Sequence, residues 1–284
     1  MTQADGRRNR RTSDRGPAPA LLLASVLALA FLLLPLLSLL VGAPWGAMTE
    51  VLRTTVVVEA AILSAATSVV AALLAAMLGV PLAWVLARGQ LPATRIWRAL
   101  VTLPMVLPPV VGGVALLQAF GRRGLVGGYV FEFSGQAITF SPVAVVLANT
   151  FVALPFVVVT VEGAFTNLDP RYEQVAATLG AGKMRIFALI ALPSVRPSLR
   201  AGLVLAWARA LGEFGATMTF AGNIPNRTQT LPLAVSVAQD SGDRETALAI
   251  SVLMVVVSFS VLLMLREHWW HGRRATGGRG TRGT

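Results

Sequence analysis

Long apolar runs separated by short polar stretches dominate the pattern of residues along the chain. A helix that crosses a membrane needs about 20 mostly apolar residues. Six runs meet this requirement, and we predict spans at 20–41, 56–87, 99–120, 142–161, 201–220 and 247–265. The sequence therefore predicts an all-α fold, a polytopic membrane helical bundle of about six transmembrane helices.

Composition supports lipid as the main solvent of the chain. Hydrophobic residues make up 55% and charged residues 13%, whereas a soluble domain carries about 25% charged residues. Cysteine is absent, which excludes disulfides, a thiol nucleophile and cysteine-ligated metals. The two histidines, His268 and His271, both lie near the C-terminus. We therefore predict no catalytic residue, no metal site and no cofactor in this chain.

The basic residues indicate how the bundle is oriented. The formal net charge is +11, but the basic residues lie mostly between the apolar runs, which argues against nucleic acid as a partner. The side that holds both chain ends carries 18 Lys and Arg residues, against 5 on the opposite side. Because cytoplasmic loops carry the excess of Lys and Arg, we predict an inner-membrane protein with both termini in the cytoplasm. A basic tail at 1–19 and a disordered tail at 266–284 would then flank a transmembrane domain at 20–265.

The loop at 165–200, on the predicted cytoplasmic side, has the pattern of two short helices. Asp169 suits an N-cap position and Pro170 the first helical position. Apolar residues then recur at helical spacing up to Gly180, a residue typical of a helix end. A second helix is predicted at about 183–192, with a proline ending it. The sequence thus predicts a compact helix–glycine–helix unit.

The spacing in this loop resembles the EAA loop of ABC importer permeases. That loop reads E-A-A, three residues, G, nine residues, I, any residue and L-P. The matching positions in this chain are Gln174, Val175, Ala176, Gly180, Ile190, Leu192 and Pro193. Gln174 replaces the glutamate and Val175 the first alanine, while Glu173 lies one position early and points elsewhere on the helix.

The resemblance implies a role in coupling to an ATPase. In that family the loop inserts into a cleft on a separate ATP-hydrolysing subunit, so Glu173 and the seven matching residues are the expected coupling residues. ATP and Mg would be bound by that partner. This chain lacks the phosphate-binding loop, because Ala177 and Met184 stand where its first glycine and its Ser or Thr belong. The alternative is an amphipathic loop that lies on the membrane.

The fifth predicted span contains a possible ion pair. Arg209 and Glu213 are four residues apart, which places them on one face of a helix. A charge at membrane depth is costly unless it is paired. The pair would either act as a polar hinge in the transport path or fix the packing of neighbouring helices, and the sequence leaves both interpretations open.

The region around this pair narrows the family. The segments 209–217, 221–225 and 227–233 closely resemble molybdate-type permeases and are similar to the sulfate and tungstate types. The resemblance covers about residues 50–265. It implies a homodimer that pairs with two ATPase subunits and receives an oxyanion from an extracytoplasmic binding protein, which would dock on the loop 223–233.

A path for a tetrahedral dianion should bind it weakly, so that the ion is released. Hydroxyls, amides and exposed backbone suit this task, and the prolines between Pro104 and Gly113 break the backbone ladder where they could line or gate the path. The candidate path residues are Ser64, Thr67, Pro108, Pro109, Gln118, Asn149, Thr150 and Thr217. For each polar residue, a packing hydrogen bond between helices is the alternative.

The sequence therefore predicts the permease subunit of an ATP-driven importer, not an enzyme, with molybdate as first choice and sulfate or tungstate as alternatives. A different class, an ion-coupled secondary transporter, would need ionisable residues at midplane. Only Arg209 and Glu213 qualify, and they can neutralise each other.

Overall fold

The computed structural model describes residues 19–274, and side chains up to residue 263. The predicted tail 1–19 therefore lies almost wholly outside the described residues, as do residues 275–284 of the other tail. Every regular element in the described part is a helix, which confirms the all-α prediction. The chain divides into two units, Met1–Ala43 and Pro44–Thr284.

The described part of the first unit, from residue 19 on, contains a single helix, α1 (Pro19–Gly42). It carries no Asp, Glu, Lys or Arg, and none of its residues is buried. Pro35 lies inside the helix, and the hydroxyl of Ser38 donates to the Pro35 carbonyl at 2.8 Å. Its length and composition are those of a membrane span, as predicted for 20–41.

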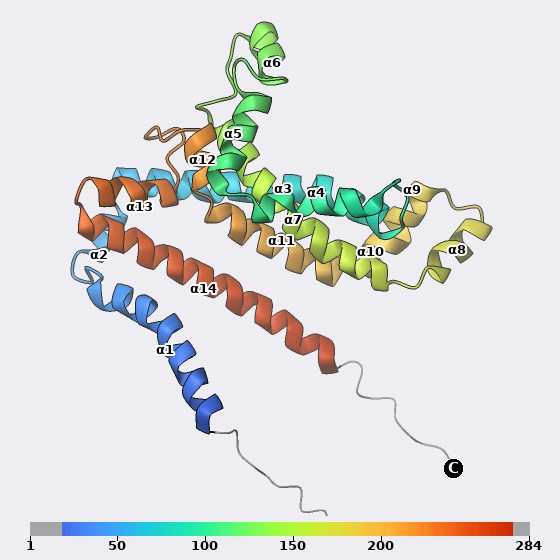
Figure 1. Ribbon diagram of the computed structural model, residues 1–284, viewed down its shortest axis with the longest axis horizontal. Coiled ribbons are helices and arrows are strands. Elements are labelled where there is room, and N and C mark those ends of the chain that lie inside the picture. Colours follow the sequence, from blue (N-terminus) through green and yellow to red (C-terminus); the bar gives the residue numbers. More distant parts are fainter. Residues whose placement is uncertain (1–18, 275–284) are drawn as a thin grey trace, which may run out of the picture. The chain divides into compact units, whose positions relative to one another are not determined.

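The second unit is built around α3 (Thr55–Ala87), α7 (Pro142–Asn167) and α11 (Arg196–Leu211), which pack against one another (Figure 1). Small residues allow these helices to approach closely. A Cβ at Gly79 of α3 would lie 3.1 Å from Val158 Cγ2 of α7. The shared core is mostly alanine, valine and leucine on α3, α7 and α11, with Phe165 at one end.

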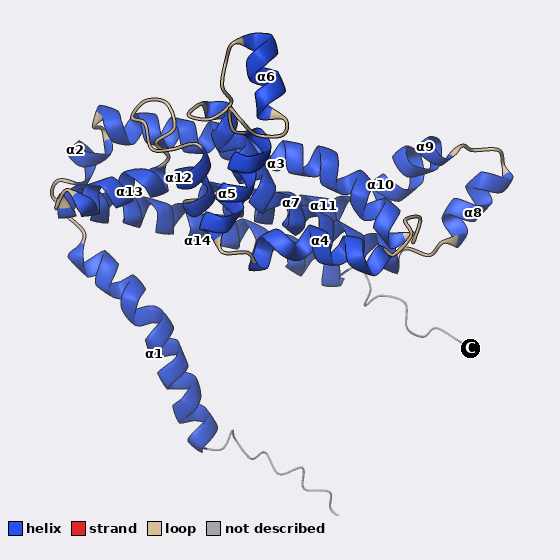
Figure 2. Cartoon of the chain, turned by 45° about the horizontal axis from the view of Figure 1, so that its top comes forward, coloured by secondary structure: helices blue, strands red, loops and turns tan. Residues whose placement is uncertain are grey.

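The remaining elements are shorter, except for the last helix. Figure 2 shows helices joined by loops, with α8 and α9 at one end of this unit and α2 and α13 at the other. These elements are α2 (Met48–Leu52), α4 (Thr94–Val106), α5 (Pro109–Phe120), α6 (Gly127–Ser134), α8 (Arg171–Thr178), α9 (Lys183–Ile186), the π-helical turn Phe187–Ala191, α10 (Leu192–Ser194), α12 (Gly215–Phe220), α13 (Leu231–Asp240) and α14 (Arg244–Arg274).

Asp243 begins α14. Its Oδ1 accepts a hydrogen bond from the Thr246 backbone N–H at 3.1 Å, as an N-cap residue does. The pKa of the exposed Asp243 carboxyl is lowered, mainly by a hydrogen bond from the Thr246 side chain and also by one from the Thr246 backbone N–H. The helix continues past Leu265, the predicted end of the last span.

Two spans that the sequence predicts as continuous, 99–120 and 201–220, are broken. The described chain has four unbroken helices long and apolar enough to cross a membrane, or up to six when two bent pairs each count as one span: α4 with α5, and Lys183–Ser194 with α11. The helices α4 and α5 meet at 116° across Leu107 and Pro108. Leu107 is extended, with ψ 134°, because a following proline disfavours the helical conformation. The predicted span 201–220 is broken at 212–214, between α11 and α12.

The short helices that follow these breaks, α5 and α12, pack directly together (Figure 1). Two glycines make this contact possible. A Cβ at Gly113 would lie 2.5 Å from Thr219 Cβ, and a Cβ at Gly215 would lie 2.6 Å from Pro109 Cβ. Real Cβ atoms do not approach so closely, so neither position can carry a side chain without moving the helices.

Candidate functional site

The predicted helix–glycine unit is present at α8. The Asp169 Oδ1 accepts from the Arg171 backbone N–H at 2.9 Å. At the other end Gly180 has φ +81°, its N–H donates to the Ala177 carbonyl, and the Ala181 N–H donates to the Ala176 carbonyl, both at 3.0 Å. These are the two bonds of a Schellman motif. Gly180 therefore ends α8 as the sequence predicts.

The second predicted helix, at 183–192, is longer than expected, and Pro193 does not end it. The chain runs through α9, the π-helical turn and α10 to Ser194 before it bends by 77° into α11. A wider π turn accommodates a proline ring that would clash with the carbonyl four residues earlier. The Ser194 hydroxyl donates to the Ile190 carbonyl at 2.7 Å.

One face of α8 and the start of α9 is apolar, and the described residues leave it uncovered. The exposed fractions are 63% for Tyr172, 59% for Val175, 83% for Leu179 and 78% for Met184. Of the predicted coupling residues, Gln174, Val175 and Gly180 are exposed. The half-buried members are Ala176, Ile190, Leu192 and Pro193. The exposed apolar side chains form a surface that is available to a partner.

Glu173 faces the other way, toward the end of α3. Its carboxylate accepts from Arg88 through Nη2 at 2.6 Å and Nε at 3.1 and 3.2 Å, and from the Trp84 indole N–H at 3.4 Å. The sequence predicts Glu173 as one of the coupling residues, although pointing elsewhere on the helix than Gln174, and it indicates neither Arg88 nor Trp84 as a partner. In the sequence analysis Arg88 is only one of the basic residues that indicate the orientation in the membrane. A contact between residues so far apart in the sequence leaves no spacing pattern that could predict it.

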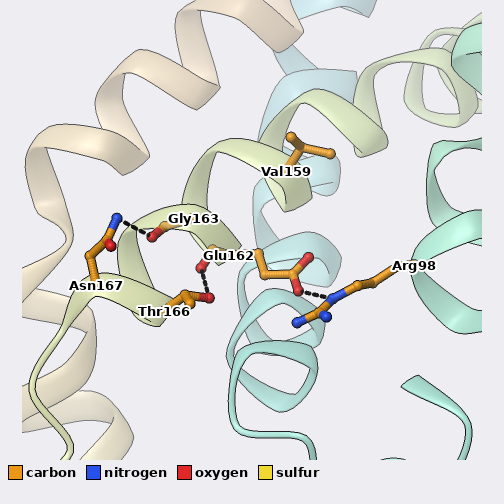
Figure 3. Close-up of a pocket in the computed structure, with 6 residues that line it drawn as sticks. All are labelled: Arg98, Val159, Glu162, Gly163, Thr166 and Asn167. Atoms are coloured by element: carbon orange, nitrogen blue, oxygen red, sulfur yellow. Dashed lines mark hydrogen bonds and ion pairs between the residues drawn. The ribbon is translucent and has the colours of Figure 1, made fainter. Parts of the chain in front are cut away.

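A second ion pair lies nearby, between α4 and α7. Arg98 Nε is 2.5 Å from Glu162 Oε1, and Arg98 Nη2 lies 3.4 Å from the Leu86 carbonyl at the end of α3. Figure 3 shows this pair beside an open pocket whose other lining residues include Thr166 and Asn167, both bonded to backbone carbonyls of their own helix. The polar groups of this pocket thus bond to one another.

Arg209 and Glu213 form the predicted ion pair, with Arg209 Nη1 2.6 Å from Glu213 Oε2. They do not lie on one continuous helix, however, because α11 ends at Leu211. Glu213 is 1% exposed, and its Oε1 accepts from the Ala216 backbone N–H at 2.9 Å. The carboxylate therefore caps α12 while it holds the last turn of α11, so the pair spans the break.

Four of the eight candidate path residues bond to neighbouring helices or to their own helix. Ser64 Oγ accepts from the buried Leu231 N–H at 2.7 Å, and Thr150 donates to the Val146 carbonyl of its own helix at 2.7 Å. Thr67 and Asn149 come together at 3.5 Å, the long limit of a hydrogen bond. Their burial fits the packing alternative better than a path lining.

The other candidates lie around the helices that follow the two breaks. Pro108, Pro109 and Gln118 are exposed at α5. Thr217 of α12 is fully buried, and its hydroxyl has no hydrogen-bond partner among the described residues. The structure does not bring the eight candidates into one site. Nor does any group of three or more His, Asp or Glu residues in the described part have the geometry to hold a metal ion.

Most of the chain is similar to known proteins. Residues 79–267 match the family described as "Binding-protein-dependent transport system inner membrane component". The molybdenum transport system permease protein ModB of Mycobacterium tuberculosis is 45% identical over 241 residues, which cover 85% of this chain and 90% of that protein. The Escherichia coli ModB is 38% identical over 72% of this chain and 90% of its own. The E. coli sulfate transport system permease protein CysT is 34% identical over 87% and 90%.

The fold also resembles that of a solved transporter. A bacterial ABC transporter involved in the import of the acidic polysaccharide alginate superposes with a TM-score of 0.68. The sequence identity is 16%, and the match covers 90% of this chain and 95% of that one. At this identity the similarity concerns the fold alone.

Proposed function

Since the chain belongs to the family of binding-protein-dependent transport system inner membrane components, we propose that it is the membrane subunit of an ATP-driven importer that carries molybdate into the cell. The observation that carries this proposal is the 45% identity to a molybdenum permease over 85% of the chain. The sulfate permease is more distant at 34%. Sulfate and tungstate, which are tetrahedral dianions like molybdate, are the alternative substrates.

The proposed orientation puts both termini and α8 in the cytoplasm. The excess of Lys and Arg on that side favours it. The loop 223–233 would then lie outside, and α13, which begins within that loop, is at the end of the unit opposite α8 (Figure 2). This arrangement separates a cytoplasmic coupling loop from an extracytoplasmic docking loop.

The proposed partners are a second copy of this chain, two ATPase subunits and an extracytoplasmic oxyanion-binding protein. ATP and Mg would be bound by the ATPase. The exposed side chains of Val175, Leu179 and Met184 support docking of α8 in a protein cleft, because apolar side chains of this size gain free energy when a partner covers them. Gln174 lies on the same exposed part of the helix.

The proposed path runs along the broken spans rather than along α3 and α7. Pro108, Pro109, Gln118 and Thr217 remain candidates there, because they lie on or beside α5 and α12, the short helices that follow the two breaks. Irregular backbone at membrane depth is tolerated only against protein or a water-filled cavity. Ser64, Thr67, Asn149 and Thr150 become packing residues in this proposal.

A single cysteine at Ala177 tests the coupling loop. The chain has no other cysteine, and Ala177 is exposed on α8. We expect a membrane-impermeant maleimide to label Ala177→Cys in inside-out vesicles and not in right-side-out vesicles, and a crosslinker at this site to capture the ATPase. The matched control is Arg227→Cys in the opposite loop, with the reverse labelling. Labelling of Ala177→Cys only from the external medium would refute the orientation and the docking.

The substrate is tested with the cognate binding protein. We expect titration calorimetry to give a dissociation constant for molybdate at least about tenfold below that for sulfate, a difference of about 1.4 kcal/mol. Uptake should require ATP and persist when the ion gradient is dissipated. Tighter sulfate binding would overturn the choice of substrate, and loss of uptake with the gradient would favour a secondary transporter.

A further inference from the structure

We propose that the ion pair between Glu173 and Arg88 transmits the movement of α8 directly to α3, which makes both of them positioning residues for coupling. This inference rests on the proposed function, because it takes α8 to be the helix that the ATPase moves. The contact joins α8 to a membrane helix that is distant in the sequence.

The geometry of the pair is suited to transmit force. Two of the Arg88 guanidinium nitrogens, Nη2 and Nε, donate to the Glu173 carboxylate, and the Trp84 indole N–H adds a third donor. The side chains of Arg88 and Glu173 are only 13% and 14% exposed. A bidentate Arg–carboxylate pair has a defined orientation, and partial burial limits screening by water and salt. The contact therefore resists both sliding and separation.

The same turn of α3 receives a second contact from the loop. The Trp84 ring lies 5.3 Å from the Phe187 ring of the π-helical turn, and Phe187 lies 6.5 Å from Phe165 at the end of α7. Movement of α8 thus reaches α3 at Arg88 and Trp84 together. Along the chain alone, α8 would act only on α7 and on the helices that follow it.

Docking of a partner leaves the pair intact. Glu173 is turned toward α3, whereas Val175 and Leu179 are exposed at 59% and 83%. A partner can therefore bind the exposed face of α8 while the ion pair holds the face that is turned toward α3. Loss of the pair should uncouple the two movements without removing the docking surface.

The test compares Glu173→Gln, Arg88→Gln and the charge swap Arg88→Glu with Glu173→Arg. Each is reconstituted in liposomes with the ATPase and the binding protein, and molybdate uptake and ATP hydrolysis are measured together. We expect each single variant to hydrolyse ATP while uptake per ATP falls by about tenfold, within the range seen for residues that carry coupling. The swap should restore most of this ratio.

The control is Arg98→Gln, which breaks the ion pair with Glu162 at the same end of the bundle (Figure 3). That pair does not involve α8, so uptake per ATP should stay at the wild-type value. An unchanged ratio in Glu173→Gln and Arg88→Gln would overturn the inference. So would a swap variant that is no better than the single variants, or an equal loss of assembled complex in all three, since the pair would then be structural only.

The wild-type complex separates this result from the proposed function. If the wild-type chain does not assemble with an ATPase, the proposed function fails and the inference fails with it. If it assembles and transports, the ratios above decide the inference alone.

Discussion

Leucine in place of Glu213 should abolish uptake and destabilise the protein by roughly 2–4 kcal/mol. The substitution removes the carboxylate that caps α12 through the Ala216 N–H at 2.9 Å and pairs with Arg209 at 2.6 Å. It leaves the guanidinium without its counter-ion, and breaking a pair with a buried member costs more than the pair contributes. The α11–α12 break would lose both of its polar anchors.

Glutamine at this position is the matched control. Its amide oxygen can still accept from the Ala216 N–H, but it carries no charge to balance Arg209. We expect Glu213→Gln to unfold at a temperature between those of wild type and Glu213→Leu, with partial uptake. Thermal unfolding of the purified protein and uptake in vesicles give the two readouts. Wild-type values in Glu213→Leu would show that the pair is dispensable.

Leucine at both Pro108 and Pro109 should lower uptake by at least about tenfold, or about 1.4 kcal/mol, while leaving assembly with the ATPase intact. The prolines hold Leu107 and Pro108 extended and produce the 116° bend between α4 and α5. Without them a helix can continue through this position, because the missing N–H is restored and the residue before each site regains helical freedom. A straight helix would pull α5 away from α12.

The control for this variant is Pro81→Leu. Pro81 lies inside α3, which continues through it without a break, so replacing it should not change the path of the chain. Uptake in membrane vesicles is compared with the amount of complex that co-purifies. Normal uptake in the double variant would exclude the α4–α5 bend from the transport mechanism.

The helices that the sequence predicts best are those with a long, uninterrupted apolar run. α1, α3 and α7 begin within about two residues of the predicted spans because the hydrophobic requirement of the membrane defines them. Gly180 was also predictable, since a helix end with positive φ favours glycine. These features depend on local chemistry that the sequence displays directly.

The break at 212–214 was not predictable from hydropathy. The residues on both sides are mostly apolar, no proline marks the position, and Gly212 and Gly215 are equally compatible with close helix packing. The i, i+4 spacing of Arg209 and Glu213 predicts an ion pair on one helix, and it gives no sign that Glu213 also caps the next helix. Only the three-dimensional arrangement shows that its carboxylate bonds to the next helix.

Contacts between segments that are distant in the sequence could not be predicted for a different reason. Glu173 has no periodic relation to Arg88, and Ser64 has none to Leu231, so no spacing rule links either pair. The hydroxyls among the path candidates were predicted only from their ability to form weak hydrogen bonds with an anion. Ser64 bonds to a backbone N–H of another helix, the packing role that was the alternative for each of them.

The glycine contact between α5 and α12 restricts how the protein can change conformation. Because neither Gly113 nor Gly215 has room for a Cβ, these two helices interlock and cannot slide past each other without separating. We therefore expect the two helices to move together, with changes in backbone torsion at the breaks 107–108 and 212–214. A conformational change that keeps this contact would then act through only these two breaks, one beside Pro108 and the other at the buried carboxylate of Glu213.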